Sequence, residues 1–451
     1  MELCYHNIIR GINSIFYIKT IMRIRAITIG QNIPILYESL EIQDFLENKL
    51  EKYYVFYREL IEEFRNNNIP VDSKRICSQP LINHEEQLAH RKDVQQTLLL
   101  LHSELEILQK MCKKYEIDYF ACCTMLAEEL KSFGIYEKLL LNDFDKLLKE
   151  FPRFFTSLPI ISKSVINLSA LKAGTKIIKK LSEPDPLNNL RFCISCNVPA
   201  NTPFFPAAYH KNSEKVAFSI AIEMADEVIN IFQQESSSMV DAINNLKRRF
   251  NEIYDQVLRI CEKVNKNYDL EFTGMDFSPA SYPQLERSIG SAIENLGIEY
   301  FGSHGTLLGV ALITNSIPKK EKIIGFSGFM QPVLEDFILA KRVREKRLRL
   351  EDLLLYSTVC GTGLDCVPLP GDITERELFH IILDLGTISI LYNKPLTARL
   401  MPIPDKFAGD DIEFDFEYFS SSKVMDFKRL IVPNKKDLFR GNESSLNFEL
   451  L

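Results

Sequence analysis

The sequence lacks the common short motifs for phosphate, dinucleotide and zinc-protease chemistry. It contains no GxGxxG, no Walker loop and no HExxH, so sites of those kinds are not predicted. It also lacks short-period repeats, low-complexity tracts and any Gly- or Ser-rich linker, which favours one folded unit over an array of domains. The 10 cysteines follow no regular framework, and we expect them to be reduced thiols.

Strong net charge and a membrane-spanning run are also missing. A net charge of −7 over 451 residues gives no general attraction to nucleic acid or anionic lipid. The basic run at 341–349 is explained by one exposed helix face, since no aromatic platform or motif accompanies it. The apolar patch within residues 1–21 is too short to span a bilayer and precedes no cleavage site. We therefore expect a cytoplasmic protein that binds neither membrane nor nucleic acid, with 1–21 an extension or misassigned start.

What the sequence does contain is an alternation of strands and helices. Helical periodicity is seen at 41–67, 84–114 and 239–266. Roughly ten strands suit an α/β barrel or a large doubly wound sheet. We expect one domain at 22–427 and a C-terminal tail at 428–451 that wraps a neighbour or the core. The strand candidates lie at 23–30, 74–78, 118–124, 158–165, 191–198, 216–222, 269–277, 322–327 and 398–403.

Glycines and short polar residues gather where these strands should end. Ligands in α/β folds usually bind at the carboxyl ends of strands, so a site is expected there, although glycine also ends helices. The clusters are Gly302–Ser303–His304–Gly305–Thr306, Gly325–Phe326–Ser327–Gly328 and Cys360–Gly361–Thr362–Gly363–Leu364–Asp365.

These clusters also carry a family resemblance, together with three further segments. The further segments are Phe204–Phe205–Pro206–Ala207–Ala208–Tyr209–His210, Asp276–Phe277–Ser278–Pro279–Ala280 and Lys394–Pro395–Leu396–Thr397–Ala398–Arg399. In this order they resemble the domain of unknown function 711 family, also called uncharacterised protein family 0210, from about residue 23 to 427. The resemblance implies a ten-stranded α/β barrel with outer helices, like that of pyruvate formate-lyase and other glycyl radical enzymes. It also implies a homodimer, and no known activity.

Two segments depart from the pattern of the bacterial branch of that family. Ala121–Cys122–Cys123 stands where that branch has glycines, and Ala221–Ile222–Glu223 replaces a glycine-rich turn. Radical chemistry is disfavoured, because Gly441 is the one candidate glycine near the C-terminus and lacks the expected neighbours. Cys122–Cys123 lies too early in the chain to match the paired thiols of pyruvate formate-lyase, and fold alone says little about function.

Three residues are the catalytic candidates. His304 opens a helix after Gly302 and Ser303, where imidazole could act as general acid–base and the backbone of Gly305 and Thr306 could hold an anion. The alternative is a capping turn. Cys360 could be a nucleophile if a histidine activated it, with Asp365 orienting a partner, or it could be a small buried residue that permits close packing.

The remaining candidates are ligand-binding residues. Arg399 or Lys394 could fix a carboxylate or phosphate, or form a structural ion pair with an aspartate, and Lys74 and Arg75 share that ambiguity. Asp276 could orient partners. Tyr209 and His210 follow the proline-bounded Phe204–Phe205 and could face a pocket, or the phenylalanines could be a plug or dimer contact. No carboxylate cluster has metal spacing, and Cys193 and Cys196 face opposite sides of a strand with no second pair.

The sequence leaves three hypotheses of function open. The first is an enzyme acting on a small polar or anionic metabolite by acid–base or thiol chemistry, with His304, Cys360 and Arg399 sharing one pocket. The second is a non-catalytic, ligand-sensing homodimer that uses the same pocket. The third is a structural scaffold whose glycines serve packing alone. The sequence names no cofactor for any of them.

Overall fold

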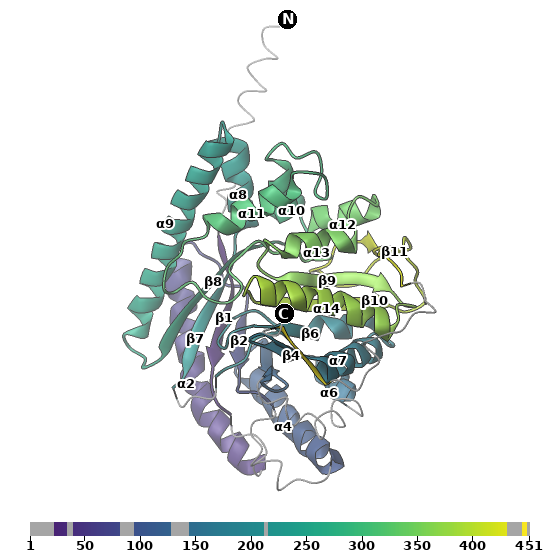
Figure 1. The fold of residues 1–451 in the computed structure, drawn as a ribbon. Helices are drawn as coiled ribbons and strands as arrows, with labels where there is room; N and C mark the ends of the chain where they lie inside the picture. The colour runs from purple at the N-terminus through teal and green to yellow at the C-terminus, as the bar shows by residue number, and fades with distance from the viewer. Residues whose placement is uncertain are drawn as a thin grey trace, which may run out of the picture.

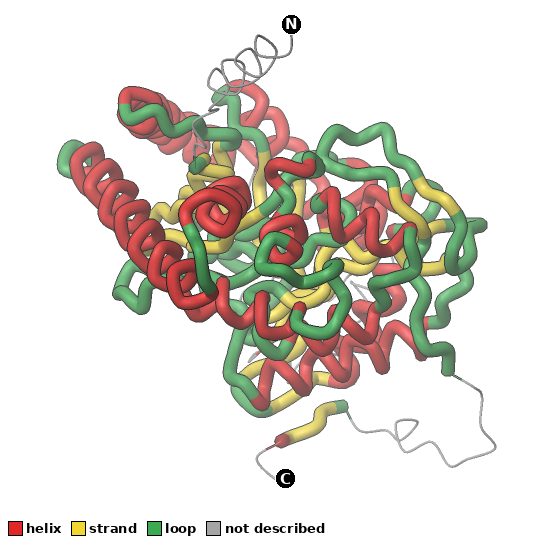
Figure 2. Tube along the Cα trace, turned by 90° about the horizontal axis from the view of Figure 1, so that it is seen from above, coloured by secondary structure: helices red, strands yellow, loops and turns green. Residues whose placement is uncertain are grey.

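A computed structural model describes residues 22–33, 39–81, 94–127, 144–211, 215–430 and 444–448. Helices surround a large sheet (Figures 1 and 2). The strands are β1 (Arg23–Gly30), β2 (Lys74–Cys77), β3 (Tyr119–Cys123), β4 (Phe154–Ser162), β5 (Val165–Asn167), β6 (Phe192–Cys196), β7 (Ala217–Glu223), β8 (Glu271–Ala280), β9 (Gly363–Pro370), β10 (Leu396–Ile403), β11 (Asp411–Ile412), β12 (Ser422–Lys423) and β13 (Ser445–Asn447).

The helices fill the connections between strands and lie outside the sheet (Figure 1). Long helices α2, α4, α9 and α14 carry most of the covering surface. The α-helices are α2 (Ser39–Asn66), α4 (Val94–Lys114), α6 (Phe144–Glu150), α7 (Leu168–Leu181), α8 (Ala225–Asn230), α9 (Met239–Asn265), α10 (Ile289–Glu294), α11 (Thr306–Ser316), α12 (Phe337–Arg344), α13 (Leu350–Ser357) and α14 (Glu375–Leu391). Short turns of other helix types are η2 (Pro186–Arg191), η3 (Ile231–Glu235) and η4 (Leu285–Arg287).

The strands pair in the order β8-β7-β1-β2-β3-β4-β6-β10-β9. β1, β2, β3, β4 and β6 run parallel to one another. The pairs β7–β8 and β9–β10 are also internally parallel, but each meets the central block through an antiparallel ladder. The fold is therefore mixed α/β with a large, mostly parallel sheet.

The two ends of this order, β8 and β9, are linked by one intervening segment. Isolated parallel bridges join Met275 of β8 to Ile323, and Pro332 to Asp365 of β9. The described strands thus form a path of ladders with β8 and β9 at its ends, not a ring of ten ladders. Residues of both end strands line one cavity, so the sheet is strongly curved.

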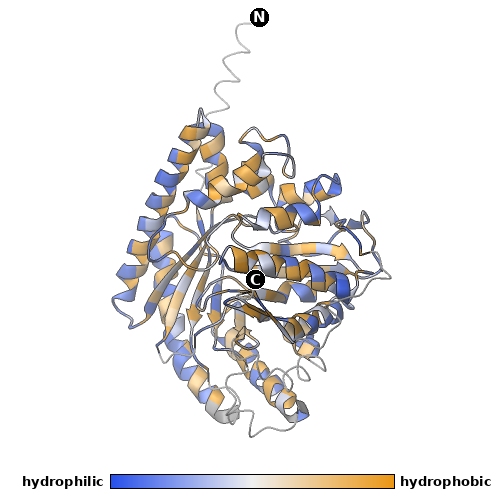
Figure 3. Cartoon of the chain, in the orientation of Figure 1, coloured by the Kyte–Doolittle hydropathy of each residue, from blue (hydrophilic) through white to orange (hydrophobic). Residues whose placement is uncertain are grey.

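Burial follows the sequence pattern of the elements. β10 and β9 are buried throughout, as expected of strands covered on both faces. α9 buries one stripe of apolar residues and exposes polar ones, and Figure 3 shows both kinds along its length. Local caps fix the ends of other helices, such as the capping box of Thr374 and Glu377 that begins α14. No helix in the described part of the chain combines the length and apolar character needed to cross a lipid bilayer.

Most predicted elements are confirmed, with two exceptions. The strand predicted at 322–327 is wrong, because Gly325 (φ +70°) and Ser327 (φ +32°) turn the chain and leave one bridge at Ile323. The glycine cluster at 360–365 was predicted as a turn, but Gly363 begins β9. The predicted helix at 84–114 is observed as α4, and residues 84–93 lie outside the described part.

The tail and the cysteines have defined places. Residues Ser445–Asn447 form β13, which pairs antiparallel with β5 of the same chain, so this part of the tail contacts the core. The nine cysteines in the described ranges are buried and form no disulfide. Cys193 and Cys196 both lie on β6, where burial raises the pKa of each thiol. Gly441 and residues 1–21 lie outside the described residues.

Candidate functional site

A charged cavity of about 470 Å³ opens between the central parallel strands and the two outer strand pairs. Its lining comes from β1, β2, β3, β4, β7, β8, β9 and β10 and from the loops and short turns between strands. A site was expected at the carboxyl ends of the strands. The cavity lies at the carboxyl ends of β7 and β8 but at the amino ends of β1 to β4, since β7 and β8 run antiparallel to those central strands.

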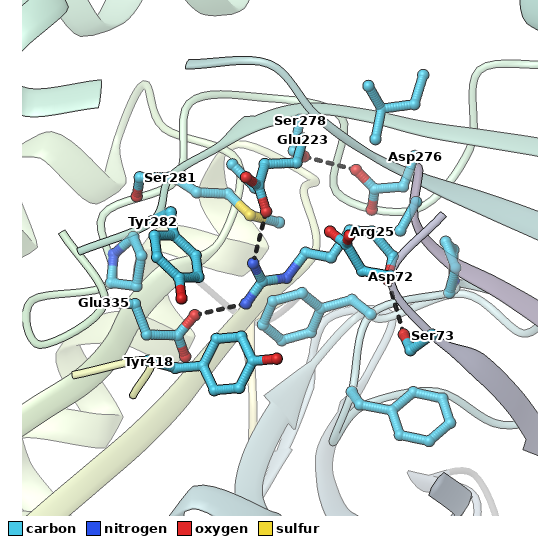
Figure 4. Close-up of a pocket in the computed structure, with 18 of the residues that line it drawn as sticks. Arg25, Asp72, Ser73, Glu223, Asp276, Ser278, Ser281, Tyr282, Glu335 and Tyr418 are labelled. Carbon is cyan, nitrogen blue, oxygen red and sulfur yellow. Dashed lines mark hydrogen bonds and ion pairs between the residues drawn. The ribbon is translucent and has the colours of Figure 1, made fainter. Parts of the chain in front are cut away.

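An alternating chain of charges crosses this cavity (Figure 4). Arg25 on β1 donates to Glu223 on β7 at 3.0 Å and to Glu335 at 2.9 Å. Arg399 on β10 donates to Glu335 at 2.9 Å and to Asp365 on β9 at 2.5 Å. Such a network is stabilising when each buried charge is paired and hydrogen-bonded.

Arg287 at the end of η4 completes this chain by pairing with Glu223. Its guanidinium also lies over the ring of Tyr282, 4.0 Å from the centroid. The charge network of six residues, Arg287–Glu223–Arg25–Glu335–Arg399–Asp365, therefore contains three cations and three carboxylates. It joins β1 and β7 to β9 and β10 across the cavity.

The two carboxylates that share Arg399 differ in their proton affinity. Burial raises the pKa of Asp365, and Glu335 raises it further, against the attraction of Arg399. Burial would also raise the pKa of Glu335, but Arg399 and Arg25 outweigh it and hold that pKa below its usual range. Environments that push two neighbouring carboxyl pKa values apart suit one group to hold a proton and the other to accept one.

Asp276 on β8 holds the glycine loop at 325–328 beside the cavity. Its carboxylate accepts from the backbone N–H of Phe326 at 2.9 Å, from that of Ser327 at 3.2 Å, and from Ser278 Oγ at 2.5 Å. A Cβ on Gly325 would lie 2.4 Å from Asp276 Oδ2. Burial raises the pKa of Asp276 against these hydrogen bonds. Asp276 therefore orients groups of its own chain, and a role for it in binding a ligand stays a prediction.

Asp276→Ala is expected to lower the free energy of unfolding by about 3 kcal/mol, because it leaves two backbone N–H groups without their hydrogen-bond acceptor. Urea denaturation of the purified variant measures this loss. Asp276→Asn keeps one acceptor oxygen and should lose less. Equal losses in the two variants would contradict the role given to the carboxylate.

Arg399 lies in the cavity, but it is not available as an anion anchor. Its donors are engaged by Asp365 and Glu335, and its side chain is 5% exposed. The alternative interpretation, a structural ion pair with an aspartate, describes it better. Lys394 is likewise occupied: Nζ donates to the carbonyl of Ser357 at 3.0 Å and to that of Cys360, where it satisfies the carboxyl end of α13.

His304 and Cys360 do not share this cavity, so the expected convergence of His304, Cys360 and Arg399 is not observed. His304 is exposed in the turn before α11. Cys360 is buried, burial raises the pKa of its thiol, and its Sγ accepts from the N–H of Gly363 at 3.3 Å. A buried thiol with a raised pKa is a poor nucleophile.

The turn that carries His304 is satisfied by its own contacts. The N–H of Gly302 donates to Thr306 Oγ1 at 3.1 Å, and Ser303 Oγ donates to the carbonyl of Tyr300 at 2.7 Å. Gly305 is the N-cap residue of α11 and makes no side-chain hydrogen bond there. These residues form the capping turn that was the alternative to an anion site.

Tyr209 and His210 also lie apart from the cavity lining. Tyr209 donates to the carbonyl of Val198 at 3.1 Å, and His210 Nδ1 lies 2.7 Å from Asn201 Oδ1. The N–H of His210 donates to the carbonyl of Ser78, just after β2. The loop that carries both residues is thereby fixed to the sheet. The preceding Phe204 and Phe205 do line the cavity.

Residues that the sequence reading missed supply much of the lining. Arg25, Glu223 and Glu335 were not named as site candidates, although a charged residue inside an apolar strand such as Ile24–Arg25–Ala26 signals a buried pair or a site. Arg342, assigned to one exposed helix face, is instead buried on α12 and donates to Glu294 at 2.7 Å and 2.8 Å. Within the described residues, no cluster of histidine, cysteine and carboxylate side chains could hold a metal ion.

These features define a class: an α/β protein with a curved, mostly parallel sheet around a charged cavity. Among the described residues, no thiol or imidazole lines this cavity. The family model described as "Uncharacterised ACR (DUF711)" matches residues 18–421, and the chain belongs to that family. The chain is 26% identical over 407 residues to a UPF0210 protein of Methanosarcina barkeri, covering 87% of each chain. It is 25% identical over 382 residues to one of Lactobacillus delbrueckii, covering 83% of each. With that of Pyrobaculum aerophilum the identity is 27% over 401 residues, covering 86% of each.

Proposed function

We propose that this protein binds a small polar or anionic metabolite in the charged cavity. The observation that carries this proposal is the lining itself: a space of about 470 Å³ that combines five arginines with seven aromatic rings. Binding sites for small molecules are typically concave, of several hundred Å³, with apolar walls and a few fixed polar groups. The cations are Arg23, Arg25, Arg75, Arg287 and Arg399, and the rings are those of Tyr119, Phe155, Phe204, Phe205, Tyr282, Phe416 and Tyr418.

The balanced charge network supports binding because it supplies a rigid wall. The charges of the network are already paired with one another, so a ligand can bind beside them without having to neutralise them. Tyr282 adds a hydroxyl beside Glu335, and the ring of Tyr418 lies next to the same carboxylate (Figure 4). Burial raises the pKa of Tyr418, which keeps its hydroxyl protonated. Preorganised donors of this kind favour binding because little ordering is left for the ligand to impose.

A thermal-shift screen against metabolites tests this proposal. A ligand at a hundred times its dissociation constant should stabilise the protein by about 2.7 kcal/mol. Ala221→Leu narrows the cavity from β7 and is expected to abolish the shift. Ala311→Leu on α11, outside the lining, is the matched control and should keep it. No shift across a broad panel would sink the proposal and favour the scaffold.

Acid–base catalysis is the second candidate function. Asp365 and Glu335 favour it, because both line the cavity and their pKa values are pushed in opposite directions. Glu335 would accept a proton and protonated Asp365 would return one. A metabolite found in the screen should then exchange carbon-bound hydrogen for deuterium in D₂O, followed by NMR. Asp365→Asn should abolish exchange while binding persists; exchange at the parent rate would exclude this role.

The finer architecture implied by the family resemblance is also part of the proposal. A barrel with ten strand positions, like that of glycyl radical enzymes, is supported by the bridges from Met275 to Ile323 and from Pro332 to Asp365. The cavity would then occupy the barrel interior. The homodimer and the cytoplasmic location stay predictions. Light scattering on the purified protein measures its mass, and twice the chain mass of 52.1 kDa is the expected value.

A further inference from the structure

Arg75 differs from every other arginine that lines the cavity. Arg23 pairs with Asp72, and Arg25, Arg287 and Arg399 belong to the charge network. Among the described residues, no carboxylate lies within ion-pair distance of Arg75. Its Nε donates to Ser73 Oγ at 2.9 Å, and its two terminal nitrogens make no hydrogen bond to any residue that the structure describes. Four N–H groups are therefore left to face the cavity.

The surroundings of Arg75 fix the plane and position of its guanidinium. The group lies 5.0 Å from the ring centroid of Phe205 and 5.6 Å from that of Tyr119. Ser73 Oγ is itself fixed, because it donates to the carbonyl of Arg25 at 2.7 Å. Aromatic faces and one anchored Nε hold the terminal nitrogens in place without occupying them. A guanidinium so held presents two parallel donors, the geometry that matches a carboxylate or phosphate.

The local charge balance also favours an incoming anion. The side chain of Arg75 is half-buried. Burial first, and then repulsion by Arg25, lower the pKa of Arg75 to about 10, against the weaker attraction of Asp118 and Glu335. Asp118 accepts a hydrogen bond from the backbone N–H of Lys74 instead. A half-buried cation held beside a second cation is costly in the empty cavity, and a bound anion would relieve that cost.

We propose that the terminal nitrogens of Arg75 bind the oxyanionic group, a carboxylate or phosphate, of the cavity's ligand. This inference rests on the proposed function and names the chemical class of the ligand. Phe205 and Tyr119 form the walls of this subsite, and the charge network lies beyond it. The ligand's anionic end is thereby directed toward β2 and its remainder toward Glu335 and Arg399.

The test uses isothermal titration calorimetry with two probes, inorganic phosphate and succinate, at constant ionic strength. At least one is expected to bind the parent protein, and the tighter of the two identifies the ligand's anionic group. Arg75→Gln should weaken that binding at least about thirty-fold, the effect of losing a charge-assisted bidentate contact. Arg248→Gln, on the exposed surface of α9, is the matched control and should leave affinity unchanged.

Arg75→Lys keeps the charge but loses the paired donors, so it should weaken binding about ten-fold. Because Arg75 has no carboxylate partner, Arg75→Gln should be at least as stable as the parent without anion, whereas a structural ion pair would predict a loss. Unchanged affinity in either variant, or binding of neither probe, would overturn the inference. A metabolite shift lost in Ala221→Leu but kept in Arg75→Gln would overturn this inference while leaving the proposed function intact.

Discussion

Arg399→Met is expected to lower the free energy of unfolding by about 3–5 kcal/mol, the cost of leaving buried charges without their partner. Arg399 binds Asp365 and Glu335 at 2.5 Å and 2.9 Å, and its side chain is 5% exposed. Removing the guanidinium leaves Asp365 without its hydrogen-bonded cation and Glu335 with Arg25 alone. Urea denaturation at pH 7 measures the loss. Arg248→Met removes an exposed α9 pair and should cost under about 1 kcal/mol.

The loss in Arg399→Met should shrink as the pH falls. In the parent, Arg399 opposes the effect of burial on the pKa of both carboxyl groups. Without it the folded-state pKa of Asp365, already raised, rises further and the lowered pKa of Glu335 rises as well. The folded variant therefore binds more protons than the folded parent, so its stability relative to the parent falls with rising pH. The difference between parent and variant should therefore be smaller at about pH 5 than at pH 7. A difference that grows on acidification would contradict the ionised network.

Gly328→Ala is expected to cost about 3 kcal/mol, the upper part of the range for overpacking a rigid site. A Cβ on Gly328 would lie 2.6 Å from the Cα of Gly361 and 2.8 Å from its backbone nitrogen. The N–H of Gly361 donates to the carbonyl of Phe329 at 2.8 Å, so the two backbones cannot separate without losing this bond. This close backbone contact holds the loop at 325–328, which Asp276 orients, next to the residues that lead into β9.

Thermal unfolding of two alanine variants tests this contact. Gly297 has φ +89° and nothing within 4 Å of an added Cβ, so Gly297→Ala should cost about 1 kcal/mol of backbone strain alone. Gly328→Ala should unfold at a clearly lower temperature than Gly297→Ala. Similar midpoints would show that the backbones at Gly328 and Gly361 are free to move apart.

Much of the fold could be predicted because local sequence specifies it. The strand Arg23–Gly30 and the helix Met239–Asn265 carry clear periodic patterns, and both were predicted within two residues of their bounds. β9 was missed because it begins at a glycine with φ +92° and contains two prolines, at 368 and 370. Both features usually interrupt strands. In β9 they are accommodated by its place at the end of the ladder path, beside β10.

The site could be predicted in part. Asp276, Asp365 and Arg399 were selected as polar residues near strand ends, and all three line the cavity. An ion pair of Arg399 with an aspartate was one open alternative, but its second partner, Glu335, lies 64 positions away and was not predicted. Arg25 and Glu335 are 310 positions apart and meet across the cavity. Proximity of that kind depends on the curvature of the sheet, which no local pattern encodes.

His304 and Cys360 illustrate the opposite error. Both stand in glycine-rich segments that resemble site loops, yet the glycines serve close backbone approaches. A Cβ on Gly302 would lie 2.4 Å from the carbonyl oxygen of Arg347, and Gly361 crosses Gly328. A glycine in such a segment indicates close backbone packing as often as it indicates a ligand site. Arg75 was left open between anion anchor and ion pair, and the missing carboxylate partner now favours the anchor.

The most direct test of a ligand site at Arg75 is a crystal structure of the protein soaked in tungstate, an oxyanion with a strong anomalous signal. We expect an anomalous peak inside the cavity, within hydrogen-bond distance of the terminal nitrogens of Arg75 and between the rings of Phe205 and Tyr119. An empty cavity at saturating tungstate, with Arg75 turned onto a carboxylate of its own chain, would contradict the account.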